Sequence, residues 1–330
     1  MGVSTGVWVI TCVAILGLFV FDFFAHVRVA HEPTFRESAF WSTVYVSLAV
    51  LFGFFIWWHW GSEYGGEYFA GYVTEKALSV DNLFVFTVIM TSFAVPRIYQ
   101  QKLLLIGIVM ALVMRALFIA VGAAAINAFS WVFYVFGAFL IFTALKLARE
   151  SGHEREAEVE RENRLVGFVR RFVPTTDDYH EDKFITRVDG KRAVTPMMLA
   201  LVAIGFTDLL FALDSIPAIY GLTEEPYIVF TANAFALMGL RQLYFLIGGL
   251  LDRLIYLSAG LSIILGFIGV KLMLHALHKN TLPFINGGNY VDVPEISTGM
   301  SISVIGVVLL VTTVASLLKT RGRTAPKTSL

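Results

Sequence analysis

Long apolar runs, interrupted by short polar stretches, make up most of this 330-residue chain. A helix needs about 20 apolar residues to cross the roughly 30 Å hydrocarbon core of a bilayer. The runs of this length fall at about 5–25, 38–60, 67–94, 102–124, 126–148, 196–220, 226–250, 254–278 and 299–318. The pattern predicts an all-α polytopic membrane protein with about nine transmembrane helices.

The composition supports a membrane protein and excludes several other classes. Hydrophobic residues make up 57% of the chain, charged residues only 15%, and the mean hydropathy is +0.73. A soluble domain of this length needs more polar surface. We therefore expect the lipid bilayer as a partner and no nucleic acid, and the formal net charge of the chain is zero. The single cysteine, Cys12, excludes an intrachain disulfide.

The distribution of lysine and arginine predicts the orientation of the chain in the cell membrane. Nine spans divide the loops into two sets, and positively charged loops stay in the cytoplasm. One set contains Arg28, Arg97, Lys102 and most basic residues of the loop and tail, whereas the other contains only Lys279. We therefore expect a multi-pass protein with its N-terminus outside and its C-terminus in the cytoplasm.

The spans and loops divide the chain into six segments. These are two N-terminal spans (1–66), a first three-helix repeat (67–148), a charged cytoplasmic loop (149–195), a second three-helix repeat (196–278), an extracytoplasmic loop (279–298), and a last span with a basic tail (299–330).

Two stretches of the long cytoplasmic loop are open to more than one interpretation. The apolar stripe within 165–172, flanked by arginines, is typical of a helix that lies on the anionic inner leaflet, or of a solvated charged loop. The acidic stretch 177–182 either holds a metal ion or stays hydrated.

An internal repeat places polar residues inside two of the apolar runs. Four residues of the first copy have counterparts 133 positions later, and the pairs are Thr74 with Thr207, Glu75 with Asp208, Asp81 with Asp214, and Asn82 with Ser215. Each copy comprises three spans, and an odd number of spans makes the second copy start on the opposite side of the membrane. Such inverted repeats are typical of secondary transporters, whose substrate site lies near the midplane.

The spacing within each copy gives one polar face per helix. Positions seven apart nearly coincide on an α-helix, so Thr74 lies above Asp81, and Glu75 lies above Asn82. Each intramembrane acid costs about 2.5–3.5 kcal/mol, which favours a functional role. Carboxylate, amide and hydroxyl oxygens are ligands of hard divalent cations such as Mg²⁺, Ca²⁺ and Mn²⁺.

Other polar residues in the spans are open to alternative interpretations. Lys76, Arg115 and Arg241 are predicted to form structural or gating ion pairs rather than direct contacts with a substrate. Asn233 is either an auxiliary ligand of the metal ion or a group that forms a hydrogen bond between helices. Asp22, near the cytoplasmic end of the first span, either takes part in the function or only extends to the membrane–water interface. We expect the hydroxyl oxygens of Thr74, Thr207 and Ser215 to be auxiliary ligands of the metal ion.

Four long motifs resemble the TerC family of integral membrane proteins, within the LysE-type transporter superfamily. They are EKALSVDNLFVF (75–86), TDLLFALDSIPAIYGLT (207–223), IVFTANAFALMGLRQLYF (228–245) and GFIGVKLML (266–274). The resemblance implies export of Mn²⁺ or a similar cation. The metal site it implies consists of Glu75, Asp81, Asn82, Asp208 and Asp214.

One position departs from the family pattern. A glutamate commonly stands three residues before the aspartate that matches Asp208, and here that position is Gly205. This change makes the implied site less negative.

These observations predict a transporter that exports divalent metal ions by alternating access through a carboxylate-lined midplane site. As a hypothesis, protons that compete for the carboxylates couple export to the proton gradient. We expect no resident cofactor and no enzyme activity. An intramembrane hydrolase with paired aspartates is disfavoured, because neither a GxGD nor an HExxH motif is present and the acids repeat symmetrically. The first alternative is a non-transporting membrane scaffold of a metal or tellurite stress-resistance complex, in which the charges form a rigid polar core. A further alternative is an exporter of amino acids or organic cations.

Overall fold

A computed structural model describes residues 1–27, 31–150, 179, 183–188, 191–247, 254–280, 282–283 and 285–320. The predicted stripe at 165–172, the acidic stretch 177–182 apart from Tyr179, and the basic tail beyond Thr320 lie outside the described residues.

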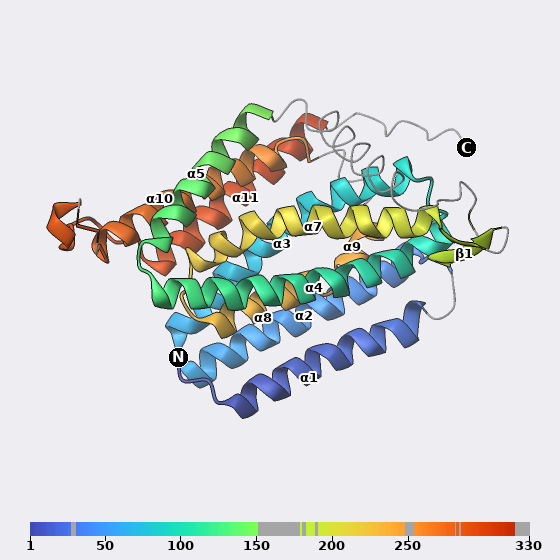
Figure 1. The fold of residues 1–330 in the computed structure, drawn as a ribbon, viewed down its shortest axis with the longest axis horizontal. Coiled ribbons are helices and arrows are strands. Elements are labelled where there is room, and N and C mark those ends of the chain that lie inside the picture. The colour runs from blue at the N-terminus through green and yellow to red at the C-terminus, as the bar shows by residue number, and fades with distance from the viewer. Residues whose placement is uncertain are drawn as a thin grey trace.

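Helices cover all nine of the predicted spans, which confirms the all-α fold (Figure 1). The helices are α1 (Thr5–Asp22), η1 (Phe23–Val27), α2 (Phe35–Trp60), α3 (Ser62–Ser92), α4 (Arg97–Ala128), α5 (Val132–Glu150), α7 (Pro196–Tyr220), α8 (Pro226–Leu237), α9 (Leu240–Ile247), α10 (Leu257–His278), η3 (Asn286–Gly288) and α11 (Thr298–Thr320). A short hairpin of β1 (Ile185–Val188) and β2 (Lys191–Val194) precedes α7.

Eight helical segments in the described part of the chain are long and apolar enough to cross a membrane. In one of them α8 and α9 count together. The remaining predicted span, α3, is 31 residues long and is also the most polar. Its charged residues are Glu63, Glu67, Glu75, Lys76 and Asp81.

The polar helix α3 lies inside the bundle, where it packs against α2, α7, α8 and α11 (Figure 1). The neighbouring helix α4 shows how a span separates its two faces. Val113, Leu117 and Val121 form an exposed apolar stripe at intervals of four residues. Ile108 and Arg115 are buried on the same helix. The exposed stripe is suited to lipid, and the buried face meets α7 and α8.

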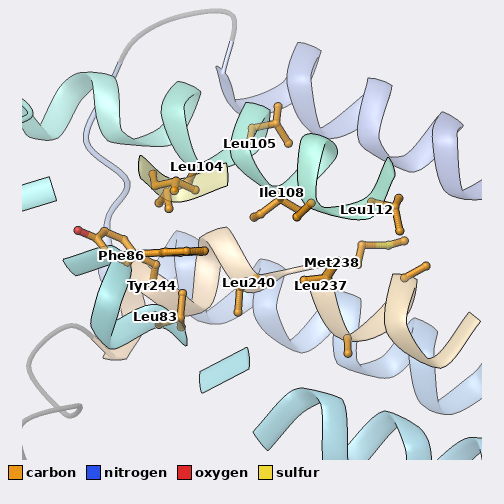
Figure 2. Close-up of a cluster of buried hydrophobic side chains, with 14 of the residues drawn as sticks. Leu83, Phe86, Leu104, Leu105, Ile108, Leu112, Leu237, Met238, Leu240 and Tyr244 are labelled. Atoms are coloured by element: carbon orange, nitrogen blue, oxygen red, sulfur yellow. The ribbon is translucent and has the colours of Figure 1, made fainter. Parts of the chain in front are cut away.

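Packing in the interior is close because small residues lie at helix crossings. A Cβ atom added to Gly137 of α5 would lie 3.0 Å from the carbonyl oxygen of Gly269 of α10, and the reverse distance is also 3.0 Å. Figure 2 shows the larger side chains that fill the space between α3, α4 and the α8–α9 segment, among them Leu83, Ile108 and Leu240. Lipid tails are as apolar as these side chains, so close packing rather than escape from water holds the helices together.

The described loops and helix ends lie at the two ends of the bundle. At one end, Glu63, Glu224 and His275 line a common cavity. At the other end, Asp22 and Arg241 meet in an ion pair. This arrangement agrees with alternating spans, and the inverted relation between the two triplets stays a prediction from the sequence.

The span predicted at 226–250 is broken, which the sequence analysis did not anticipate. α8 ends at Leu237, Met238 is extended with ψ 131°, and Gly239 has a φ of +78° before α9 begins at Leu240. Residues with a side chain rarely adopt a positive φ, so glycine suits this position. By contrast, α7 continues as a helix through Pro217, although proline lacks the backbone N–H group that a helix interior uses.

We predict that Gly239→Ala destabilises the protein, whereas Gly306→Ala in α11 does not. Alanine at a φ of +78° costs about 1–2 kcal/mol, and its Cβ would also lie 3.0 Å from the Cβ of Tyr45. Gly306 is helical and has no atom within 4 Å of an added Cβ. Thermal unfolding in detergent measures the difference, and equal midpoints for the two variants would contradict the strained break.

Candidate functional site

Arg115 of α4 lies at the centre of a buried polar cluster and connects the two repeats. Its side chain is fully buried, and its Nε and Nη2 atoms donate to both carboxylate oxygens of Asp208, at 3.2 and 3.1 Å. Its Nη1 atom donates to Glu75 Oε1 and, at 3.1 Å, to Ser215 Oγ. One guanidinium therefore joins α3, α4 and α7.

The positions of these residues along their helices place the cluster far from either end of the bundle. Asp208 is the central residue of α7, and Glu75 lies near the middle of α3. Both carboxylates are buried, with exposures of 2% and 0%. Ser215 follows Asp208 by seven residues and therefore lies on the same face of α7, as the spacing predicted. Because two carboxylates meet one guanidinium, the formal charge of the cluster is negative.

Several buried polar atoms of α3 and of the adjoining helix α8 have no hydrogen-bond partner within the described residues. They are Thr74 Oγ1, Glu75 Oε2, Ser79 Oγ, and both amide atoms of Asn233. Buried polar groups in folded proteins are almost always hydrogen-bonded, so a group of unpaired oxygens indicates a capacity to bind a polar ligand. Thr74, Glu75 and Ser79 come from α3, and Asn233 comes from the adjoining helix α8.

The second pair of repeat-matched acids, Asp81 and Asp214, contacts other helices. Thr143 of α5 donates to Asp214 Oδ1 at 3.1 Å. Ser258 of α10 donates to Asp81 Oδ1 at 3.5 Å. Both aspartates are half-buried. Each aspartate therefore contacts the third helix of the other triplet.

The structure differs from the expectation that the four acids form one shell. Across the ranges that the structure describes, no three His, Cys, Asp or Glu side chains are grouped so that they could hold a metal ion. Arg115 lies between Glu75 and Asp208, and its contacts hold them as a pair. The remaining predicted donors lie on the same helices, where Asn82 of α3 is buried and Thr207 of α7 is half-buried.

The glycine at position 205 is explained by its neighbour on α4. A Cβ atom added to Gly205 would lie 2.1 Å from Cε of Met110. The methionine therefore occupies the space that a side chain at position 205 would enter. A carboxylate there would require Met110 to move.

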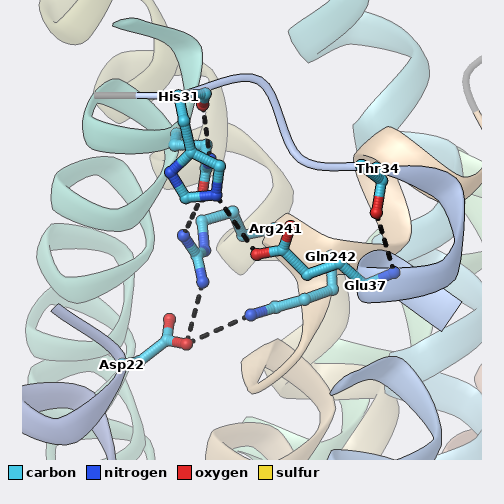
Figure 3. A network of polar contacts seen from close by, with 7 residues as sticks. Asp22, His31, Thr34, Glu37, Arg241 and Gln242 are labelled. Carbon is cyan, nitrogen blue, oxygen red and sulfur yellow. Dashed lines mark hydrogen bonds and ion pairs between the residues drawn. The ribbon is translucent and has the colours of Figure 1, made fainter. Parts of the chain in front are cut away.

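The other two predicted cations have different partners from Arg115. Arg241 of α9 donates to Asp22 at 2.8 Å and to Gln101 Oε1 at 2.5 Å, and Gln242 also donates to Asp22, at 3.1 Å (Figure 3). These contacts confirm an ion pair for Arg241 and give Asp22 a structural partner. Lys76 instead donates to main-chain carbonyl groups of the α8–α9 segment.

Sequence reasoning missed the neutral partners of these charges. Tyr45 donates to Asp22 at 2.7 Å, and Gln101 accepts from Arg241. Thr143 and Ser258 contact the second pair of acids. Their only signal in the sequence is a polar residue within an apolar run, which most often indicates ordinary helix packing.

A polar cavity of about 270 Å³ lies at the end of the bundle that contains the α7–α8 loop. Its lining includes Glu67, Lys271 and His275. In the loop, Glu224 lies 2.9 Å from His275 Nε2 and accepts a hydrogen bond of 2.6 Å from Lys279. The contact with His275, followed by that with Lys279, lowers the pKa of Glu224 to about 2.

We predict that Arg115→Met strongly destabilises the protein, because it leaves two buried carboxylates without their counter-charge. Breaking a buried ion pair from one side costs about 3–5 kcal/mol. The triple variant Arg115→Met, Glu75→Gln, Asp208→Asn removes the charges together and should recover most of that loss. Unfolding in detergent measures both, and equal stability of the single and triple variants would contradict the pairing.

We predict a pH-dependent effect for Glu224→Gln. The pKa of Glu224 is about 2 in the folded chain, against 4.5 for an unperturbed glutamate. Its ionised form therefore stabilises the fold above about pH 4.5, and this contribution disappears as the pH falls toward 2. The difference in unfolding midpoint between wild type and variant should shrink over this range. Asp292→Asn, an exposed change, is the control, and a constant difference would contradict the prediction.

Comparisons with known proteins agree with the motifs of the chain. The model of the integral membrane protein TerC family matches residues 60–324. The uncharacterized membrane protein Rv2723 of Mycobacterium tuberculosis is 54% identical over 98% of this chain and 82% of its own length. The membrane protein STKORF319 of Myxococcus xanthus is 38% identical over 96% of this chain and 94% of its own.

The name of a third relative refers to a function. Alx of Escherichia coli, named as a candidate membrane-bound redox modulator, is 39% identical over 75% of this chain and 78% of its own length. No solved structure matches the chain. The family match spans most of the sequence and includes the helices that carry Glu75, Arg115 and Asp208. The chain belongs to the TerC family of integral membrane proteins.

Proposed function

We propose that this protein exports a divalent metal cation, Mn²⁺ above all, through a site formed by Glu75 and Asp208. The observation that carries the proposal is the pair of buried carboxylates that share one buried guanidinium in the interior of a membrane bundle. Ionisable groups inside membrane segments mark ion and substrate pathways. Carboxylate and hydroxyl oxygens suit a hard cation.

The charges of the cluster favour exchange between Arg115 and the transported ion. Two carboxylates neutralise one divalent cation completely, whereas a cation beside the guanidinium would leave the buried cluster positive. Binding of the metal ion therefore requires Arg115 to withdraw from at least one acid. Glu75 Oε2 and the hydroxyl group of Thr74 have no hydrogen-bond partner and are oxygens that the incoming ion would use.

Asp81 and Asp214 provide a second pair of acids on the same two helices. Both are half-buried, and their contacts with Ser258 and Thr143 leave them attached to α10 and α5. In the proposal they receive the ion from the first pair, or hand it on, as the triplets move relative to each other. The predicted inverted repeat is the basis for alternating access, and protons that compete for the acids supply the coupling.

The proposed direction of transport and the orientation of the chain in the membrane are both inferred from the sequence. The family resemblance implies export, and the positively charged loops place the C-terminus in the cytoplasm. The name of Alx refers to redox chemistry. Cys12 in α1 is the single cysteine of this chain, so a dithiol pair cannot form within it.

One observation favours the scaffold alternative. Arg115 already neutralises part of the charge of Glu75 and Asp208, as it would in a rigid polar core. A scaffold need not bind metal, so Mn²⁺ binding by the purified protein separates the two functions.

We predict that expression of the wild type in a manganese-sensitive bacterial strain lowers the intracellular Mn content, and that Glu75→Gln, Asp208→Asn, Asp81→Asn or Asp214→Asn abolishes this effect. Loss of a ligand costs at least about tenfold in metal affinity, because even indirect partners of ligands contribute about 10–100-fold. Metal content per cell, normalised to the amount of protein in the membrane, is the measurement.

Asp292→Asn is the matched control, because this aspartate is exposed in the 279–298 segment and is not one of the four acids of the proposed site. It should lower the Mn content as the wild type does. Equal Mn content in cells with wild type and with the four site variants would count against export through this site.

A further inference from the structure

Lys76 places an ammonium group beside main-chain carbonyl groups in the middle of the bundle. It follows Glu75 in α3, yet its Nζ atom donates to the carbonyl oxygens of Ala236, at 3.0 Å, and Met238, at 3.5 Å. Within the described ranges, no carboxylate forms an ion pair with it. The ammonium group is thus bound by neutral oxygens, unlike Arg115 and Arg241.

These carbonyl groups belong to the end of a broken helix. α8 ends at Leu237, and the extended Met238 and left-handed Gly239 separate it from α9. The last carbonyl groups of a helix have no partner within it, and they carry the partial negative charge of the helix dipole. In a membrane bundle such groups need a cation or a donor, and Lys76 supplies both.

Further neutral groups lie on the same helix. Asn233 is fully buried, its two amide atoms have no partner within the described residues, and it precedes Ala236 by three residues, which places the two on one face of α8. This part of α8 adjoins α3, because a Cβ added to Gly71 would lie 3.3 Å from the Cβ of Ala232.

Oxygens of carbonyl and amide groups at a helix break are typical ligands of monovalent cations in membrane proteins. We propose that the carbonyl end of α8 is a monovalent-cation site whose occupant is the ammonium group of Lys76. The chain thereby carries its own tethered cation where broken-helix transporters bind a free one. A small cation such as Na⁺, K⁺ or NH₄⁺ binds there once the ammonium group is removed.

The test compares full-length wild type and Lys76→Ala, purified in detergent, in chloride salts of Na⁺, K⁺, NH₄⁺ and choline at constant ionic strength. We expect the unfolding midpoint of the variant to fall by several degrees in choline. At least one small cation should restore part of the loss in a saturable manner. The wild type should give the same midpoint in all four salts.

Lys271→Ala is the matched control, because Lys271 lies in the membrane helix α10 and donates to the hydroxyl group of Ser301 rather than to carbonyl groups. Its midpoint should not depend on the cation. If Lys76→Ala fails to fold, Lys76→Gln takes its place with the same expected cation dependence, and Lys76→Arg should show none.

Equal midpoints of the Lys76 variant in all four salts would overturn the proposal, as would a wild type that responds to the small cations as strongly as the variant. The readout contains no manganese and no transport. Its failure therefore leaves the export proposal intact, and failure of export leaves this site intact.

Discussion

The requirement to neutralise charge inside an apolar bundle governs the interior of this protein. An unpaired buried charge is far more costly than a paired one, and a membrane offers no water to compensate it. The chain meets this requirement in three ways. Arg115 bridges Glu75 and Asp208, Arg241 binds Asp22, and Lys76 binds the carbonyl end of α8. Each cation connects helices that are distant in sequence, so the same contacts that neutralise charge also fix how the helices are arranged.

The break between α8 and α9 illustrates this connection. Its left-handed glycine packs against Tyr45, while the hydroxyl group of Tyr45 donates to Asp22. The two halves of the broken span are thereby held by different helices: Lys76 of α3 binds the end of α8, and Asp22 of α1 binds the start of α9 through Arg241. A movement that opened the break would have to disturb both cations. The contacts of Arg115 with its two acids impose a similar constraint on the proposed transport cycle, in which a metal ion replaces them only if the guanidinium withdraws.

Much of this fold could be predicted from the sequence, because hydrophobic length and the period of the helix act locally. The nine helical ranges, the polar face formed by Thr74, Glu75, Asp81 and Asn82, and an ion pair for Arg241 all follow from such patterns. The choice of partner does not, because it depends on which helices adjoin. Arg115 and Arg241 were both predicted to form ion pairs, yet one binds the acids of both copies and the other binds Asp22 outside them. The helix break at Gly239 could not be predicted from the sequence either, because glycine in an apolar run is also common in unbroken membrane helices.

In the proposed transport cycle, Arg115 and a divalent cation compete for the same two carboxylates. The most direct test of this competition is Mn²⁺ binding by purified protein, measured by electron paramagnetic resonance for wild type, Arg115→Met, and Arg115→Met combined with Glu75→Gln. Removal of the competing guanidinium should raise the affinity by at least about tenfold, or about 1.4 kcal/mol, and the added Glu75→Gln change should reverse the gain. An Arg115→Met protein that is folded and binds Mn²⁺ no more tightly than the wild type would contradict the account.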